Sequence, residues 1–173
     1  DFSFQLLFAD TESFHVSVNG VKLTFFQFPF DIPAKKTFEG IRMPDLLNLA
    51  AMKSYALGRR AKWKDYVDLY FILRDHFSLD DVIKKSEILF SGLFSPKLFR
   101  QQLCYFDDVD YTEEVSFMAG HEVSEQEMKV FLTNIATLAL WLLILLRFAA
   151  KQSNPPSDTT ALESEVDALV YGL

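Results

Sequence analysis

An Asn19-Gly20 pair lies between two arms of alternating apolar residues, and this feature restricts the fold of the first part of the chain more than any other. Residues 14 to 18 alternate between apolar and polar side chains, and the alternation resumes over residues 21 to 25. Because Asn and Gly both tolerate positive φ, the pair predicts the two-residue type I′ turn of a β-hairpin. Residues 2 to 8 show the same period of two, which predicts a further strand with one buried face.

From Pro44 onward the apolar residues follow a helical period instead of the period of two. The spacing predicts helices at about residues 44 to 58, 63 to 74, 79 to 91, 95 to 104 and 124 to 146. We place Pro44 in the first turn of the first of these helices, because proline is well suited to that position. The fold class that follows is α+β, with a short antiparallel sheet followed by a helical, bundle-like region.

Composition divides the chain into four segments. The predicted sheet occupies residues 1–33, and the helical region occupies residues 34–150. The stretch KQSNPPSDTT at 151–160 has the composition of a linker. Residues 161–173 repeat apolar side chains at the spacing of a short amphipathic helix. Whether residues 139–173 belong to the native domain, or to a fused reading frame, is left open by the sequence.

The overall composition excludes several classes of protein. The chain has 173 residues, 50% of them hydrophobic, which is too apolar for a disordered tail. Its net charge of −7 argues against a protein that coats nucleic acid indiscriminately. The single cysteine, Cys104, excludes disulfides within the chain and a thiolate zinc site, and it favours a cytoplasmic location. The sequence begins at Asp1 without a secretory signal, which we interpret as an interior point of a longer protein.

Positive charge is concentrated in one segment of this acidic chain. Residues 35–64 contain eight basic and two acidic side chains. If one helical phase continued from Lys53, then Lys53, Arg60 and Lys64 would share a face, with Asp65 and Asp68 on an adjoining face. Cations beside two carboxylates suit a nucleotide, because Lys and Arg neutralise phosphate oxygens and a carboxylate orients the cation or binds a hydroxyl. The alternative is a solvated helix with an ordinary Lys64–Asp68 pair.

Residues 43–73, MPDLLNLAAMKSYALGRRAKWKDYVDLYFIL, resemble the signature of the AbiEii-type nucleotidyltransferase toxins, a family of the polymerase-β-like nucleotidyltransferases. That family has the pattern K-x-x-A-x-x-x-R-x-x-x-K/R-D-x-x-D-L. Here the pattern is filled by Lys53, Ala56, Arg60, Lys64, Asp65, Asp68 and Leu69. The flanking sequence resembles the family up to about residue 138.

The resemblance implies transfer of a nucleotidyl group from a nucleoside triphosphate (NTP) to an acceptor such as the 3′ end of a tRNA. It implies catalytic roles for Lys53, Asp65 and Asp68, and phosphate binding by Lys53, Arg60 and Lys64. It also implies Mg²⁺ as the cofactor, a cognate antitoxin protein as partner, and a role in a toxin–antitoxin or phage-defence system.

The family's metal-binding D-x-D, which follows a Gly-Ser turn, is absent from this sequence, and we expect it upstream of Asp1. The chain is therefore predicted to be the C-terminal part of such an enzyme, inactive alone. The acidic run at 107–114 lacks the glycine of a calcium loop, so we assign no metal ligand in this chain. The alternative function is a non-catalytic module that binds an antitoxin protein or RNA.

One long uncharged stretch raises the question of a membrane anchor. Residues 130–146 contain no charged side chain and include LALWLLILL. As a helix they would extend about 26 Å, slightly less than the ~30 Å hydrocarbon core of a bilayer. We therefore favour a helix buried in the protein, or a surface left bare by residues missing from this chain, over a membrane anchor.

Overall fold

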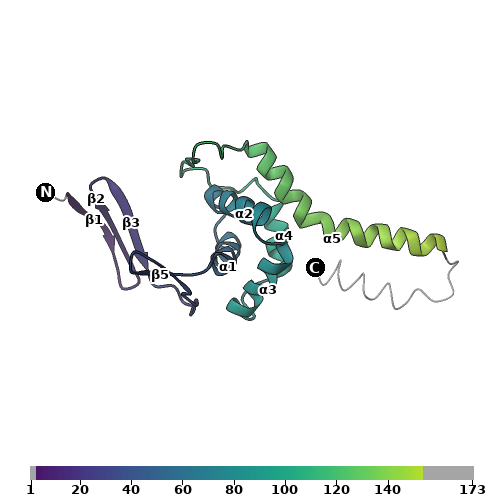
Figure 1. The fold of residues 1–173 in the computed structure, drawn as a ribbon, viewed down its shortest axis with the longest axis horizontal. Helices are drawn as coiled ribbons and strands as arrows, with labels where there is room; N and C mark the ends of the chain where they lie inside the picture. Colours follow the sequence, from purple (N-terminus) through teal and green to yellow (C-terminus); the bar gives the residue numbers. More distant parts are fainter. Residues whose placement is uncertain (1–2, 154–173) are drawn as a thin grey trace. The chain divides into compact units, whose positions relative to one another are not determined.

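The computed structural model describes residues 3–153, and it divides the chain into two units, residues 1–32 and the part from Pro33 onward. The predicted α+β class is confirmed: an antiparallel three-stranded sheet and a small hairpin precede five helices in the described residues (Figure 1). The strands are β1 (Phe4–Ala9), β2 (Ser13–Val18), β3 (Val21–Phe26), β4 (Lys36–Phe38) and β5 (Ile41–Met43). The helices are α1 (Leu46–Leu57), α2 (Trp63–Asp75), α3 (Leu79–Phe90), α4 (Pro96–Leu103) and α5 (Glu125–Ser153).

The first unit is the sheet β1-β2-β3, and its hairpin confirms the prediction from Asn19-Gly20. Asn19 has φ 50° and Gly20 has φ 81°, as a type I′ turn requires of both central residues. Val18 and Val21 are therefore paired directly across the turn.

The expected alternation along β1 is interrupted by a shift in register. Leu6 pairs with Val16, but Phe8 pairs with His15, so one extra residue is accommodated between them. The Phe8 and His15 rings meet edge to face, with their centroids 5.5 Å apart. The single buried face predicted for residues 2 to 8 was therefore wrong: the bulge moves the Phe8 side chain to the opposite face, and every residue of β1 is exposed.

The second unit begins with a hairpin, β4-β5, that the sequence analysis missed. Its turn is formed by Glu39 and Gly40, with φ 47° and 81°. These values repeat the geometry of the first hairpin. Each arm has only three residues, which is too short for a period of two to be visible.

Helix α1 is capped by a side chain at its N-terminal end and by a backbone N–H at its C-terminal end. The Asp45 carboxylate accepts a hydrogen bond from the Asn48 backbone N–H at 2.8 Å, which makes Asp45 the N-cap. Pro44 thus precedes the cap, and its predicted place in the first turn was wrong. The helix ends at Leu57 with Gly58 as its C-cap, and α2 starts at Trp63. One helical phase therefore does not continue from residue 53 to residue 64.

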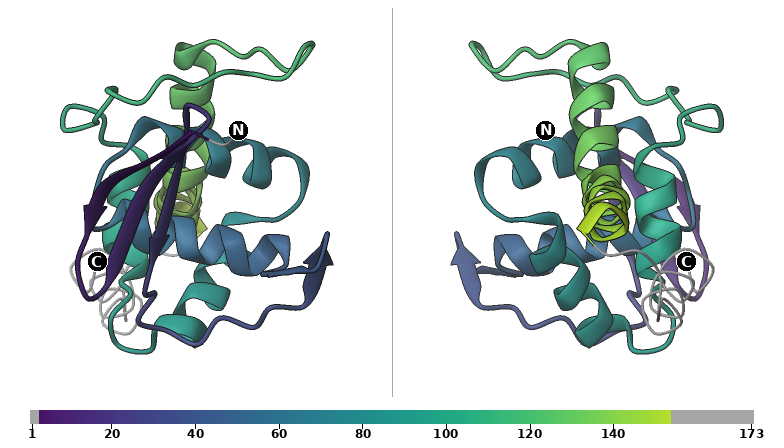
Figure 2. Two further views of the ribbon diagram at one scale, coloured as in Figure 1. Left: turned by 90° about the vertical axis from the view of Figure 1, so that its left-hand side faces the viewer. Right: turned by 90° about the vertical axis from the view of Figure 1, so that its right-hand side faces the viewer.

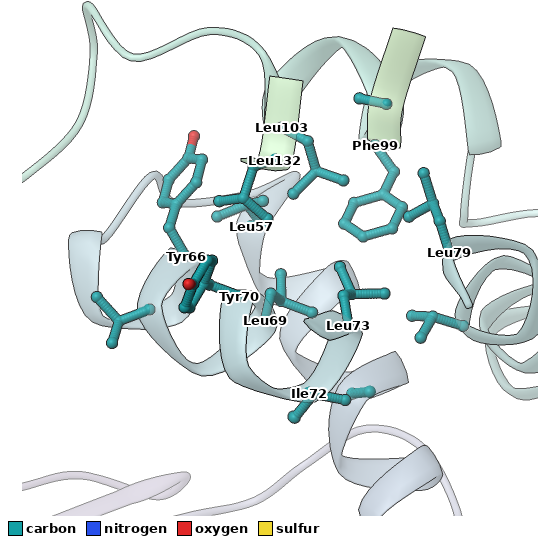
Figure 3. Packing of buried hydrophobic residues seen from close by; sticks show 14 of the residues in the cluster. Leu57, Tyr66, Leu69, Tyr70, Ile72, Leu73, Leu79, Phe99, Leu103 and Leu132 are labelled. Carbon is teal, nitrogen blue, oxygen red and sulfur yellow. The ribbon is translucent and has the colours of Figure 1, made fainter. Parts of the chain in front are cut away.

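The helices of the second unit pack against one another around a shared core, with α1 in contact with three of the others (Figures 1 and 2). Helix α2 contacts α1 and α5, while α1 also contacts α3 and α4. Because α2 has neighbours on more than one side, eight of its 13 residues are buried. Figure 3 shows side chains from all five helices converging in this core. Its labelled members are Leu57, Tyr66, Leu69, Tyr70, Ile72, Leu73, Leu79, Phe99, Leu103 and Leu132.

Helix α5 is longer than the sequence predicted. It continues past residue 146 to Ser153, and so includes the first residues of the expected linker at 151–160. Among residues 3–153, no helix combines the length and the apolar character needed to cross a membrane. The predicted helix at 161–173 lies outside the described residues.

Candidate functional site

The packing of α1 against α2 brings Lys53 together with two aspartates of the next helix. Its ammonium Nζ donates a hydrogen bond to Asp65 Oδ1 at 2.8 Å and lies 2.5 Å from Asp68 Oδ2. Asp65 and Asp68 are three residues apart on α2, so both carboxylates project from one face of that helix. The three residues predicted as catalytic therefore form one cluster.

Arg60, from the loop between the two helices, joins the cluster through the second oxygen of Asp65. Its Nε lies 3.6 Å from Asp65 Oδ2, which is an ion pair and not a hydrogen bond. In the part of the chain that the structure describes, Asp65 Oδ2 is buried and accepts no hydrogen bond. We refer to Lys53, Arg60, Asp65 and Asp68 as the lysine–aspartate cluster.

Exposure increases outward across the lysine–aspartate cluster. Side-chain exposure is 0% for Asp65, 21% for Lys53, 50% for Asp68 and 56% for Arg60. A buried carboxylate is stable only when it is paired, so Asp65 fixes the position of the Lys53 ammonium from the inside. The outer side of the cluster, with Asp68 and Arg60, remains accessible to a ligand.

The pKa of Lys53 reflects two opposing effects. Partial burial of the ammonium lowers the pKa, but hydrogen bonds to Asp65 and Asp68 and the charges of both carboxylates outweigh that effect. The pKa of Lys53 is therefore raised above its ordinary value of 10.5. Lys53 is a fixed positive charge at neutral pH, suited to binding an anion and unsuited to accepting a proton.

Lys64 does not join the other cations. It forms an ion pair with Glu113, which also pairs with Lys62. The shared face predicted for Lys53, Arg60 and Lys64 was wrong at Lys64, because the break between α1 and α2 changes the direction of the chain. The Lys64–Asp68 pair of the alternative interpretation does not occur among the ion pairs of residues 3–153.

Glu113 instead fixes the loop between α4 and α5 to the start of α2. Hydrogen bonds from Lys62 and Lys64 lower the pKa of Glu113 from its ordinary value of 4.5 to about 2. The backbone reinforces this contact, since Trp63 N donates to Asp110 O at 3.0 Å. Lys62 and Lys64 thus hold the loop in place.

We expect Glu113→Gln to lower the free energy of unfolding at neutral pH by less than about 1 kcal/mol, because the Glu113 side chain is 41% exposed and solvent screens the pairs. A lowered pKa stabilises the fold above the ordinary value and loses this effect as the pH falls toward about 2. Urea denaturation at about pH 7 and about pH 3 measures the difference between wild type and variant. That difference should shrink in acid, while Glu114→Gln should have no effect at either pH; equal differences at both would contradict the assignment.

The lysine–aspartate cluster does not fit a magnesium site. Both of its carboxylates already bind the Lys53 ammonium, and Asp65 has no exposed surface. Within residues 3–153 no group of three or more His, Cys, Asp or Glu side chains is arranged to hold a metal ion. The residues fit a phosphate group better, since the outward-facing charges available to a ligand include a lysine and an arginine.

A hollow of about 540 Å³ lies at the C-terminal end of α1, and the sequence analysis missed it. It is bounded by the end of α1, by the loop between α3 and α4, and by the start of α4. Tyr55 and Arg59 line one side, and the Arg59 guanidinium carbon lies 4.4 Å from the centre of the Tyr55 ring. The i, i+4 spacing of an aromatic and an arginine was a signal for this contact in the sequence.

The chain is similar to a distant relative among known proteins. An uncharacterized protein of Aquifex aeolicus (strain VF5) is 28% identical over 120 residues, which cover 62% of this chain and 58% of that protein. The match therefore spans less than two thirds of the relative's length. No family model matches the chain, and no solved structure matches it.

Proposed function

We propose that this chain forms the phosphate-binding part of a nucleotidyltransferase, which transfers a nucleotidyl group from an NTP to an RNA acceptor. The observation that carries the proposal is the Lys53 ammonium, held by the buried Asp65 and presented at the surface beside Arg60. An ammonium that a buried carboxylate holds in position is suited to stabilise the charge that develops on a phosphate, as electrostatic catalysis requires. The resemblance of residues 43–73 to AbiEii-type enzymes supports the same function.

The arrangement assigns a separate task to each residue of the lysine–aspartate cluster. Lys53 and Arg60 bind oxygens of the triphosphate, with Arg60 able to bind two oxygens at once. Asp65 acts as a positioning residue, because its buried carboxylate contacts Lys53 and leaves no surface for substrate. A triphosphate oxygen that takes the place of Asp68 on Lys53 would free the Asp68 carboxylate.

The freed Asp68 carboxylate suits the acceptor. Its side chain is 50% exposed, so an acceptor hydroxyl can reach it and donate a hydrogen bond. Attack of that hydroxyl oxygen at the α-phosphorus forms the new P–O bond and releases pyrophosphate, while the hydroxyl proton passes to Asp68. The Lys53 and Arg60 charges stabilise the negative charge that builds on the phosphate oxygens.

The proposal is tested with the full-length gene product, the four α-labelled NTPs and a mixture of cellular RNA. We expect label to enter RNA from at least one α-labelled NTP, and no label to enter from the same NTP labelled at the γ-phosphate. The γ-label distinguishes nucleotidyl transfer from phosphoryl transfer, because pyrophosphate carries it away. Absence of α-label in RNA with all four NTPs, or transfer of the γ-label, would contradict the proposal.

A further inference from the structure

We infer that the hollow at the end of α1 binds an unpaired nucleobase of the RNA acceptor. That this RNA is the acceptor of the reaction rests on the proposed function. The hollow has a volume of about 540 Å³, within the range of pockets that bind small ligands. Two of its exposed apolar side chains are Leu93 and Leu98, at 62% and 60% exposure. Exposed leucines favour a ligand with apolar surface, and the aromatic ring and guanidinium favour one that is planar. The positive charge of the guanidinium also favours a ligand that carries a negative group, such as a phosphate, next to its planar part.

The planar group that this side of the hollow offers to a ligand is the Arg59 guanidinium, because the Tyr55 ring beneath it is only 9% exposed. The Tyr55 ring stacks on Phe90 with centroids 4.4 Å apart, which fixes its plane against the core. The Arg59 guanidinium lies 4.4 Å over the Tyr55 ring. Unpaired bases of RNA are bound by stacking on aromatic rings and on arginine planes, so the outer face of the Arg59 guanidinium, supported from below by Tyr55, is the surface on which a base can stack.

The charge of Arg59 favours RNA over an apolar peptide. Within residues 3–153, no carboxylate lies within ion-pairing distance of Arg59, so its charge is available to a phosphate. The next residue, Arg60, contacts Asp65 of the lysine–aspartate cluster. A single RNA strand could therefore place one base in the hollow and pass the two consecutive arginines. The terminal hydroxyl of that RNA would then lie toward Lys53.

Gly58 offers a way to fill the hollow without disturbing the backbone. It lines the hollow and has φ −68°, a value that any L-residue adopts. A Cβ added there would meet the Tyr55 carbonyl oxygen at 3.8 Å, which is ordinary contact. Gly58→Leu should therefore occupy the space proposed for the base, while Gly58→Ala leaves most of it open.

The experiment measures fluorescence anisotropy of a short single-stranded RNA, labelled at its 5′ end, with the full 173-residue chain. We expect Gly58→Leu and Arg59→Ala each to weaken binding about tenfold, the effect of losing one stacked base. Arg59→Ala should also reduce the dependence of log affinity on log salt by about one, whereas Gly58→Leu should leave it unchanged. The exposed Lys84→Ala serves as the matched control and should bind RNA as wild type does, while Gly58→Ala should weaken binding less than Gly58→Leu.

Thermal melts followed by circular dichroism should show all four variants folded. The inference would be overturned if Gly58→Leu and Arg59→Ala both bound RNA with wild-type affinity. It would also be overturned if an apolar peptide, and not RNA, bound in the hollow. The α-label assay reads the proposed function separately. If the full-length protein transfers label to RNA but Gly58→Leu binds RNA normally, the proposed nucleotidyltransferase function is retained. Only the assignment of the hollow to the acceptor site is then wrong.

Discussion

Replacing Lys53 with methionine in the full-length gene product should lower the transfer of α-labelled nucleotide to RNA by about 10²–10³-fold. The reason is the geometry of the ammonium, which lies 2.8 Å from the buried Asp65 on a side chain that is 21% exposed, while Arg60 contacts the same carboxylate. Methionine retains the length of the side chain but removes the charge that the proposed phosphate contact requires. Arg60 is 56% exposed and less rigidly held, so it should not compensate.

The single substitution also has a cost in stability that would confuse the assay. Without Lys53, the carboxylate of Asp65 stays fully buried, with only Arg60 near it at 3.6 Å. Leaving a buried charge without its partner costs several kcal/mol, and we expect about 2–4 kcal/mol here. Lost activity of Lys53→Met alone would therefore not separate an unfolded protein from a folded one without its phosphate contact.

The double variant Lys53→Met/Asp65→Asn resolves this ambiguity. The amide of asparagine has the shape of the carboxylate but no charge, so the double variant should recover at least about 1 kcal/mol relative to Lys53→Met. Urea denaturation measures the recovery, and the α-label assay should still show the loss of transfer. The control is Lys84→Met, which removes an exposed lysine of α3 and should leave transfer unchanged. Transfer near the wild-type level by the double variant would remove Lys53 from the site.

Local signals predicted most of the fold. The Asn19-Gly20 hairpin needs only two residues with positive φ between two alternating arms, and the sequence displays all of these. Helices α2, α3 and α4 begin and end within one residue of their predicted bounds, since their apolar spacing and N-terminal residues are encoded in a short window. Lys53 and Asp65 were singled out in the same way, because the pattern that contains them lies within residues 53–69.

Contacts between distant segments were beyond this reasoning. Glu113 pairs with Lys64, 49 residues earlier, and no spacing rule connects a loop to a helix start at that distance. The bulge before Phe8 depends on pairing with His15, which one strand alone does not reveal. Lys64 was placed with Lys53 because helical phase was extended across Gly58, where α1 in fact ends. These three errors therefore come from a tertiary contact or a helix end that overrides a local period.

Leu132→Ala should destabilise the second unit by about 3 kcal/mol, the loss typical of removing a fully buried leucine side chain and leaving a cavity. Leu132 of α5 has 0% exposure and lies near Leu103 and Leu57 in the core (Figure 3). The measurement is the midpoint of urea denaturation, with the slope compared between variants.

The matched control lies on the same helix, two residues earlier. Val130 is 49% exposed, so Val130→Ala removes apolar atoms that are already in contact with water and should change stability by less than about 0.5 kcal/mol. A small loss for Leu132→Ala would mean that α5 does not pack on α2 and α4 in solution. Because α2 carries Asp65 and Asp68 and is packed between α1 and α5, a large loss would show that the helix presenting both carboxylates is supported from its far side by α5.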